Sequence, residues 1–247
     1  MDTLTTLVLA AAALGTSVLS GVFGMAGGLI LMGVLLLLLP VPAAMTLHAV
    51  TQITANASRL VVWRAHVHWA VVPGYLAGAG LVFAVMAAVR FSPPKPWIYL
   101  LLGLIPFVAR LLPSAPDIRR RGAPALVGGL VSVLHLTAGV SGPVLDLFFL
   151  RPDLDRRLVV ATKALTQVLS HGLKFAYFSL VVPPAARHAV PLGLYIVCAV
   201  MAVVGTRLAR PLLERFSNEA FQRWSRRLVL AVGVYYLVAA ARSLGGA

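Results

Sequence analysis

Residues 4–39 read LTTLVLAAAALGTSVLSGVFGMAGGLILMGVLLLLL, a run of 36 residues without one charged side chain. Asp, Glu, Lys and Arg are in fact absent from Thr3 to Ser58. About 20 mostly apolar residues suffice for a helix to cross the hydrocarbon core of a bilayer. The run therefore belongs in a membrane. It is too long for one straight helix, and we expect it to break at Gly24-Met25-Ala26-Gly27-Gly28, because glycine allows the backbone to leave helical geometry.

The composition extends this interpretation to the whole chain. Of the 247 residues, 60% are hydrophobic and 11% are charged, whereas soluble domains average about 45–50% and 25%. Pro-, Gly- and Arg-rich segments separate seven further apolar runs, which we predict to be helical. The sequence thus predicts an all-α polytopic membrane protein with almost no extramembrane domain. The runs are residues 43–62, 69–89, 97–112, 125–150, 158–182, 190–205 and 228–244.

The sequence repeats itself at a shift of 115 residues. Thr51-Gln52 falls on Thr166-Gln167, and Gly27 falls on Gly142. The run 125–150 has its own break, Gly139-Val140-Ser141-Gly142-Pro143. We therefore predict two membrane repeats, residues 1–112 and 123–247, joined by a basic cytoplasmic connector at 113–122. Each repeat has a broken, re-entrant first element followed by three transmembrane helices, a plan that is common in secondary transporters.

The basic residues indicate how the repeats are oriented. The net charge of +14 comes from Arg in short loops, which is typical of the cytoplasmic side of membrane proteins rather than of nucleic-acid binding. If each broken element returns to its starting side, fourteen cations share one face of the membrane and four lie on the other. If the broken elements cross fully, the basic loops are divided between the two faces. The first topology obeys the positive-inside rule and makes the repeats inverted. The fourteen are Arg64, Arg110, Arg119, Arg120, Arg121, Arg151, Arg156, Arg157, Arg207, Arg210, Arg215, Arg223, Arg226 and Arg227, and the four are Arg90, Lys95, Arg187 and Arg242.

Two polar stripes follow the two breaks. Four polar residues spaced by 4, 4 and 3 positions lie on one helix face in each repeat. Because polar groups facing lipid are costly, we expect the stripes to face a cavity or each other. Interhelical hydrogen bonding of the Gln and Asn side chains, and snorkelling of the cations near the run ends, Arg59 and Lys163, are the structural alternatives. The stripes are His48, Gln52, Asn56 and Arg59, and Lys163, Gln167, His171 and Lys174.

These features predict an anion site near the middle of the membrane. Helix N-termini carry partial positive charge, so backbone N–H groups at Gly27, Gly28, Ser141 and Gly142 are predicted to hold the anion. The side chains of Thr51, Gln52, Asn56, Thr166, Gln167 and His171 would donate hydrogen bonds, and Lys174 and Arg59 would supply positive potential toward the two mouths. Close helix packing is the alternative role for the glycines.

Three kinds of titratable residue have two interpretations each. Asp146 is predicted to sit in the first turn of a helix, where the dipole favours a carboxylate, and a proton-carrying role is the alternative. His48, His135 and His171 are either packing residues or parts of a proton relay. Lys163 is a candidate for gating as well as for snorkelling.

Several segments together resemble the sulfite exporter TauE/SafE family, also called the 4-toluene sulfonate uptake permease family. They are residues 21–28 (GVFGMAGG), 137–143 (TAGVSGP), 162–167 (TKALTQ) and 171–174 (HGLK). The resemblance covers most of the chain. It implies a multi-pass carrier of the bacterial inner membrane for sulfur-containing anions such as sulfite or organosulfonates, coupled to an ion or proton gradient.

We therefore expect a secondary transporter that works by alternating access. Its partners would be a small anion and the lipid bilayer, with no nucleic acid, and the oligomeric state is left open. No GxxxxGK[ST], HExxH or GxSxG motif occurs, so we expect no enzyme, no cofactor and no metal. An anion channel and a membrane-embedded assembly factor that holds a partner helix are the two alternatives.

Overall fold

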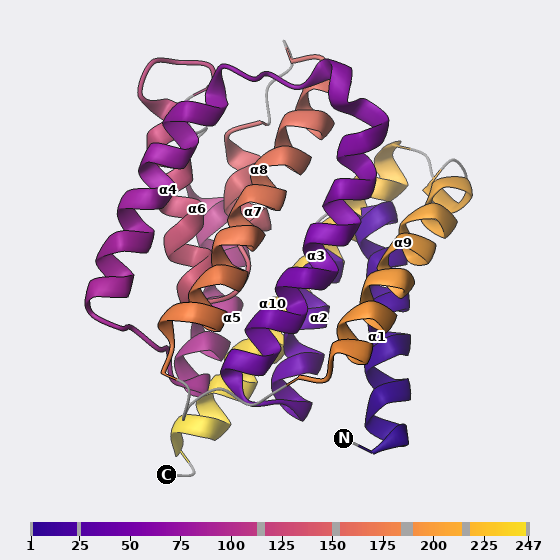
Figure 1. The fold of residues 1–247 in the computed structure, drawn as a ribbon. Helices are drawn as coiled ribbons and strands as arrows, with labels where there is room; N and C mark the ends of the chain where they lie inside the picture. The colour runs from indigo at the N-terminus through magenta and orange to yellow at the C-terminus, as the bar shows by residue number, and fades with distance from the viewer. Residues whose placement is uncertain are drawn as a thin grey trace.

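The computed structural model describes residues 2–23, 26–112, 117–149, 154–183, 190–213 and 218–245. Helices are the only regular secondary structure in these ranges (Figure 1), as the sequence predicts. They are α1 (Thr3–Phe23), α2 (Ala26–Leu38), α3 (Val41–Trp63), the 3₁₀ helix η1 (Arg64–His66), α4 (Val71–Ala88), α5 (Lys95–Leu111), α6 (Ala123–Thr137), α7 (Gly142–Leu147), α8 (Arg156–Ala176), the π-helix η2 (Tyr177–Val181), α9 (Leu192–Leu213) and α10 (Asn218–Gly245).

The first apolar run is broken where the glycines predict. α1 ends at Phe23 and α2 begins at Ala26, and α2 turns back along α1 (Figure 1). Gly27 allows this close approach, because a Cβ atom there would lie 1.9 Å from the carbonyl oxygen of Thr16. Gly24 and Met25 lie outside the described residues. The two arms differ in length, with 21 residues in α1 and 13 in α2.

The second break lies between α6 and α7. Gly139 has φ +82°, a left-handed conformation that favours glycine. α7 then starts at Gly142 with Pro143 in its first turn and has only six residues. It contacts α5 as well as α6. The break itself is as predicted, but the returning arm is about half the length of α2.

Asp155 fixes the start of α8. Its carboxylate accepts hydrogen bonds from the backbone N–H groups of Arg157 and Leu158, at 2.7 and 3.3 Å, which is the N-cap geometry. These bonds lower the pKa of the Asp155 carboxyl. The polar residues of α8 share one face because their spacing follows the period of the helix.

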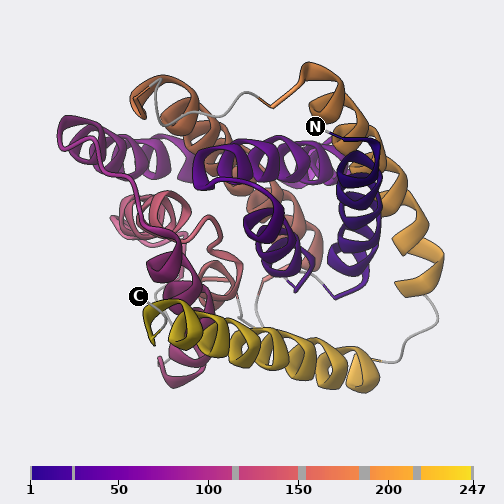
Figure 2. The ribbon, with the colours of Figure 1, turned by 90° about the horizontal axis from the view of Figure 1, so that it is seen from below.

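Two pairs of helices pack in parallel through small residues. Cys198 of α9 contacts Leu9 of α1, and Ala209, further along α9, contacts Gly21, further along α1, so the two helices run in the same direction. Gly205 lies between Cys198 and Ala209 on α9. Viewed from below (Figure 2), α9 covers α1 on one side of the molecule. α4 and α6 pack in the same way.

The α4–α6 contact is one of backbone against backbone. A Cβ atom at Gly78 would lie 1.9 Å from the carbonyl oxygen of Ala125, and one at Gly128 would lie 2.0 Å from that of Tyr75. Small residues that let helices approach this closely are typical of membrane interfaces.

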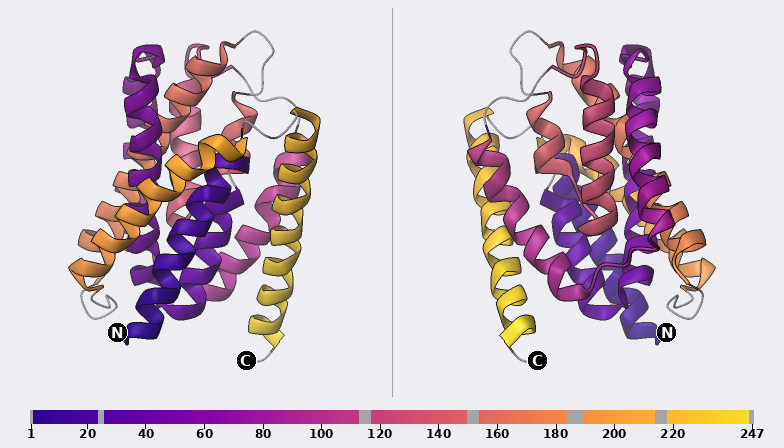
Figure 3. Two further views of the ribbon diagram at one scale, coloured as in Figure 1. Left: turned by 90° about the vertical axis from the view of Figure 1, so that its right-hand side faces the viewer. Right: turned by 90° about the vertical axis from the view of Figure 1, so that its left-hand side faces the viewer.

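Two other pairs of helices pack antiparallel. His48 near the start of α3 contacts Lys174 near the end of α8, and the guanidinium of Arg157 at the other end of α8 lies 5.8 Å from the ring centroid of Trp63. In α5 and α10, Tyr99 stacks on Tyr236, and Phe107 lies against Gly233. The side views in Figure 3 show α5 and α10 side by side along one flank.

The outer surface suits a lipid environment. Within the described residues, α1, α4, α9 and α10 each contain a segment long and apolar enough to cross a membrane. Large apolar side chains on these helices are exposed, including Leu81 (67%) and Leu192 (74%). α3 and α8 carry the polar stripes, and those polar side chains are largely buried. The protein is therefore a multi-pass membrane protein whose polar groups face inward.

Candidate functional site

The two polar stripes meet in the interior, as predicted. α3 and α8 pack along their length, and the ring centroids of His48 and His171 are 5.5 Å apart. His48 and Lys174 are both 0% exposed, and His171 is 2% exposed. His48 of one stripe thus contacts His171 and Lys174 of the other stripe in the interior.

Lys174 is the centre of this contact. Its Nζ atom lies 2.8 Å from His48 Nδ1 and 2.9 Å from the carbonyl oxygen of Gly139. His48 Nε2 lies 2.9 Å from the carbonyl oxygen of Gly28. A carbonyl only accepts hydrogen bonds, so His48 carries its proton on Nε2 and accepts from Lys174 through Nδ1. The result is an unbroken chain of hydrogen bonds from the second break, at Gly139, to the first turn of α2, at Gly28.

A second histidine pair lies against this chain. His135 Nδ1 lies 2.9 Å from the carbonyl oxygen of Val131 and must donate to it. His135 Nε2 is then the acceptor for His171 Nε2, at 3.4 Å. This leaves His171 Nδ1 buried, with no hydrogen-bond partner in the described chain. His171 therefore has one ring nitrogen that is unused.

The two glutamines lie beside the two breaks. A Cβ atom at Gly28 would be 3.6 Å from the amide group of Gln52, and Gln167 Nε2 donates to Ser141 Oγ at 3.4 Å. Gln52 and Gln167 are 7% and 8% exposed. Each glutamine thus lies beside the break of its own half, and its role as a donor to an anion stays a prediction.

Arg59 is held more loosely than Lys174. Its Nη1 atom donates to Asn56 Oδ1 at 3.2 Å, and Asn56 Nδ2 donates to the backbone oxygen of Gln52 at 2.8 Å. Arg59 Nη2 is buried and has no partner among the described residues. Since it lies eleven residues beyond His48 on α3, Arg59 is about 16 Å along the helix from the lysine.

The two threonines use their hydroxyl hydrogens within their own helices. Thr51 Oγ1 donates to the carbonyl oxygen of Leu47 at 2.8 Å, and Thr166 Oγ1 donates to that of Lys163 at 2.9 Å. Both residues are buried. Because both hydroxyl hydrogens are donated to backbone oxygens, donation to an anion would require these bonds to break.

Two expectations need correction. Asp146 does not lie in the first turn of a helix, because α7 begins at Gly142 and has no acidic residue in that turn. The Asp146 carboxylate instead forms an ion pair with Lys163 of α8. Lys174 does not lie toward a mouth of the site, since it is fully buried.

The glycines at the breaks have different roles. Gly27 faces the backbone of α1, which fits the packing alternative, whereas Gly28 faces Gln52 and offers its carbonyl to His48. At the second break, Ser141 receives the hydrogen bond of Gln167, and Gly142 opens α7. The backbone oxygens of Gly28 and Gly139, rather than N–H groups, make the observed polar contacts.

One functional contact was missed from the sequence. Tyr236 of α10 donates to the carbonyl oxygen of Leu29 at 2.5 Å and so ties α10 to the first turn of α2. Its only sequence signal is a tyrosine in the middle of an apolar run, which does not reveal a partner 207 positions away.

The described residues include no group of three or more His, Cys, Asp or Glu that could hold a metal ion. Their two ion pairs, Arg119–Asp117 and Lys163–Asp146, lie outside the cluster around Lys174. In the described part of the chain, Lys174 therefore has no carboxylate partner.

The model of the sulfite exporter TauE/SafE family matches residues 9–236. The match spans nearly the whole chain, so the chain belongs to this family of membrane transporters of sulfur-containing anions, as the resemblance predicts. Neither the curated proteins nor the solved structures contain a match to the chain.

Proposed function

We propose that the chain is a secondary transporter of organosulfonate or sulfite in the bacterial inner membrane, and that it binds the anion between the start of α2 and the break before α7. The anion would accept hydrogen bonds from Lys174, Gln52 and Gln167, and from His171 when that ring also carries a proton on Nδ1, with Arg59 lying further along α3.

The observation that carries the proposal is the buried lysine without a carboxylate. An isolated buried charge is costly unless it is paired. A bound anion would supply the missing charge to Lys174. Sulfonate and sulfite oxygens accept charge-assisted hydrogen bonds from an ammonium group, and the described chain leaves Arg59 Nη2 unpaired as a further donor.

Complete burial favours a carrier over an open channel. Lys174 and His48 are both 0% exposed, so a permanently open pore through this contact does not fit. The anion can reach them only if helices separate. Alternating access, in which one bundle moves against another around a fixed site, supplies that opening.

The proposal includes two inverted repeats with the boundaries 1–112 and 123–247, joined by residues 113–122. The helix pairing supports this arrangement. If the two halves correspond, α1 is equivalent to α6 and α9 is equivalent to α4. The parallel pair α1–α9 then corresponds to the pair α6–α4, which is also parallel. The correspondence also maps α3 onto α8 and α5 onto α10, which pack antiparallel. A two-fold axis in the membrane plane makes corresponding helices antiparallel, whereas an axis along the membrane normal makes them parallel.

The hydrogen-bond chain suggests how binding is coupled to movement. Lys174 and His48 together tie Gly139 of one half to Gly28 of the other. An anion that takes hydrogen bonds from Lys174 would replace the Gly139 carbonyl as acceptor, while His48 continues to hold the ammonium group in place. Binding would then loosen the connection between the two breaks and allow them to move relative to each other.

A ligand panel on purified protein tests the proposal. Sulfite, organosulfonates, sulfate and carboxylates are titrated, and Kd is measured calorimetrically. We expect sulfonate or sulfite to bind most tightly. Substitution of Gln52 or Gln167 by Leu should weaken binding about 3- to 10-fold each, the effect of one lost hydrogen bond. Ser58→Ala, which removes a hydroxyl bonded within α3, is the control. Unchanged affinity in both glutamine variants would reject the site.

Counterflow in proteoliposomes separates a carrier from a channel. Exchange of trapped for external labelled anion is expected for a carrier. Ungated conductance without exchange would support the channel instead. If sulfonates neither bind nor stabilise the purified protein, the assembly-factor alternative gains support.

A further inference from the structure

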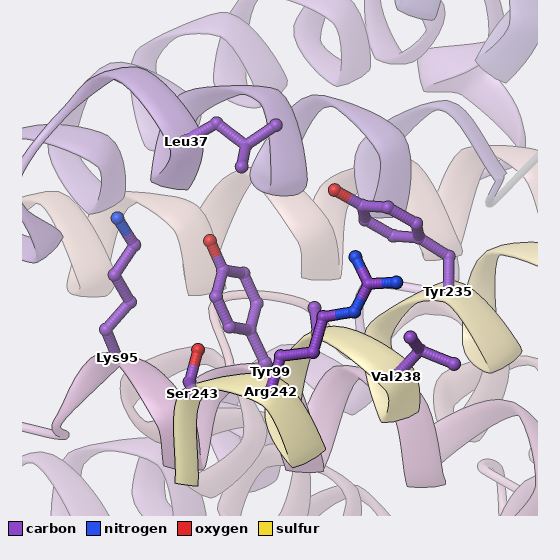
Figure 4. A pocket seen from close by; sticks show the side chains of 8 residues that line it. Leu37, Lys95, Tyr99, Tyr235, Val238, Arg242 and Ser243 are labelled. Atoms are coloured by element: carbon purple, nitrogen blue, oxygen red, sulfur yellow. The ribbon is translucent and has the colours of Figure 1, made fainter. Parts of the chain in front are cut away.

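A pocket with a volume of about 540 Å³ is lined by none of the residues of the two polar stripes. It is formed by the end of α2, the start of α5 and the end of α10, at the end of the molecule where both termini emerge (Figures 1 and 4). The lining residues are Leu37, Lys95, Tyr99, Tyr235, Val238, Ala239, Arg242 and Ser243.

The polar lining of this pocket is cationic and rich in hydroxyl groups. Figure 4 shows the ends of Lys95, Arg242, Tyr99 and Ser243 directed into the space beneath Leu37. The lining contains no Asp or Glu. Neither cation forms an ion pair with another described residue, since the ion pairs of the described chain involve other residues. The two basic side chains of the pocket therefore have no negatively charged partner among the described residues.

The rim of the pocket is apolar and exposed. Leu37 is 61% exposed and Val238 is 45% exposed. Trp97, which is in the first turn of α5 but does not line this pocket, is 56% exposed, and tryptophan at a helix end is typical of the membrane–water interface. A soluble anion would form no apolar contacts with this rim, whereas the acyl chains of a lipid would pack against it.

We propose that this pocket binds the phosphate head group of an anionic phospholipid. The phosphodiester would lie between Lys95 and Arg242, whose planar guanidinium suits phosphate oxygens. Head-group hydroxyls would meet Tyr235 and Ser243, and the acyl chains would run along Leu37 and Val238. Charge-assisted hydrogen bonds from ammonium and guanidinium groups to phosphate oxygens would hold the head group in the pocket.

The position of the pocket gives the lipid a structural effect. Tyr236, the neighbour of Tyr235, stacks on Tyr99 with ring centroids 6.0 Å apart and bonds to Leu29 of α2. A head group bound to Lys95 of α5 and Arg242 of α10 would therefore hold together the same helices that Tyr236 joins. We expect lipid binding to stabilise the packing of α2, α5 and α10.

The test measures lipid binding to the full chain in detergent by native mass spectrometry and thermal unfolding, with phosphatidylglycerol and phosphatidylcholine. One basic side chain near an anionic surface contributes about a fivefold change in affinity. Phosphatidylglycerol should therefore bind about 25-fold more tightly than phosphatidylcholine and raise Tm. The double variant Lys95→Gln/Arg242→Gln should lose this preference. Arg90→Asn is the control, because it removes a nearby charge outside the pocket and Asn tolerates the positive φ of residue 90.

Each other outcome overturns the proposal. Equal binding of the two lipids, or a preference that survives the double variant, would remove the head-group site. Inorganic phosphate that raises Tm as much as the lipid would identify a site for a soluble anion instead. If the double variant does not fold, the single variants Lys95→Gln and Arg242→Gln are measured, and each should lose about fivefold.

Discussion

Lys174 and Arg59 occupy equivalent positions in the two halves, 115 residues apart, yet their surroundings differ. Lys174 is fully buried and contacts both a histidine and the second break. Arg59 has one side-chain partner, Asn56, and one unused nitrogen. We propose that the two cations have different tasks. Lys174 connects the two halves, and Arg59 attracts an approaching anion.

The other ends of the stripes differ in the same way. His48 aligns with Lys163, but His48 contacts Lys174 of the opposite half, whereas Lys163 pairs with Asp146 of its own half. The residue that aligns with Asp146 is Leu31, which is apolar. In the second half, Lys163 is thus neutralised by a carboxylate of the same half, whereas Lys174 contacts a residue of the other half.

The largest expected effect comes from Lys174→Met, which keeps the length of the side chain and removes its charge. Charge-assisted hydrogen bonds contribute about 1.5–3 kcal/mol, so anion affinity should fall about 10- to 100-fold. Kd by calorimetry and uptake in proteoliposomes check this. Tm should not fall, because Met fills the buried space without a charge to pair. Lys163→Met is the control on the same helix, and an equal loss in both variants would contradict the special role of Lys174.

His48 should come next in size. His48→Leu removes both the acceptor for Lys174 and the donor to Gly28, so affinity should fall about 10-fold, the effect of about 1.4 kcal/mol. His48→Gln should restore part of it, because an amide accepts through its oxygen and donates through its nitrogen. Kd and Tm are measured for both variants. If His48→Gln binds the anion no more tightly than His48→Leu, the hydrogen bonds of His48 do not determine the affinity.

Arg59 should have a smaller effect that depends on salt. If the guanidinium attracts the approaching anion but does not contact it once it is bound, Arg59→Gln should lower the association rate about 3- to 10-fold and leave the dissociation rate nearly unchanged. The difference from wild type should shrink as ionic strength rises. Stopped-flow binding at two salt concentrations measures both rates. A change confined to dissociation would place Arg59 inside the occluded site, beside Lys174, and would remove the contrast between the two cations.

The sequence predicts the stripes better than the contacts within them. The spacing of His48, Gln52 and Asn56 needs only helical periodicity, and the structure places the predicted faces inward. The bond from Lys174 to the Gly139 carbonyl depends on how a six-residue helix and a left-handed glycine are packed, which periodicity does not encode. Asp146 shows the same limit, because its partner is decided by the position of α8 rather than by its own helix.

The smallest effect is expected at the Asp146–Lys163 pair. Both side chains are partly exposed, 19% and 26%, and such ion pairs contribute about 0.2–1 kcal/mol because solvent screens them. A double-mutant cycle with Asp146→Asn and Lys163→Gln, followed by thermal unfolding, should give a coupling energy in that range, with anion affinity nearly unchanged. The pH dependence of uptake in Asp146→Asn provides the sharper comparison. If Asp146 only pairs with Lys163, the profile keeps its wild-type shape, because the substitution then removes no group that carries protons. Loss of the pH dependence would indicate that Asp146 carries protons. The Asp146–Lys163 pair would then be more important for function in the second half than Lys174.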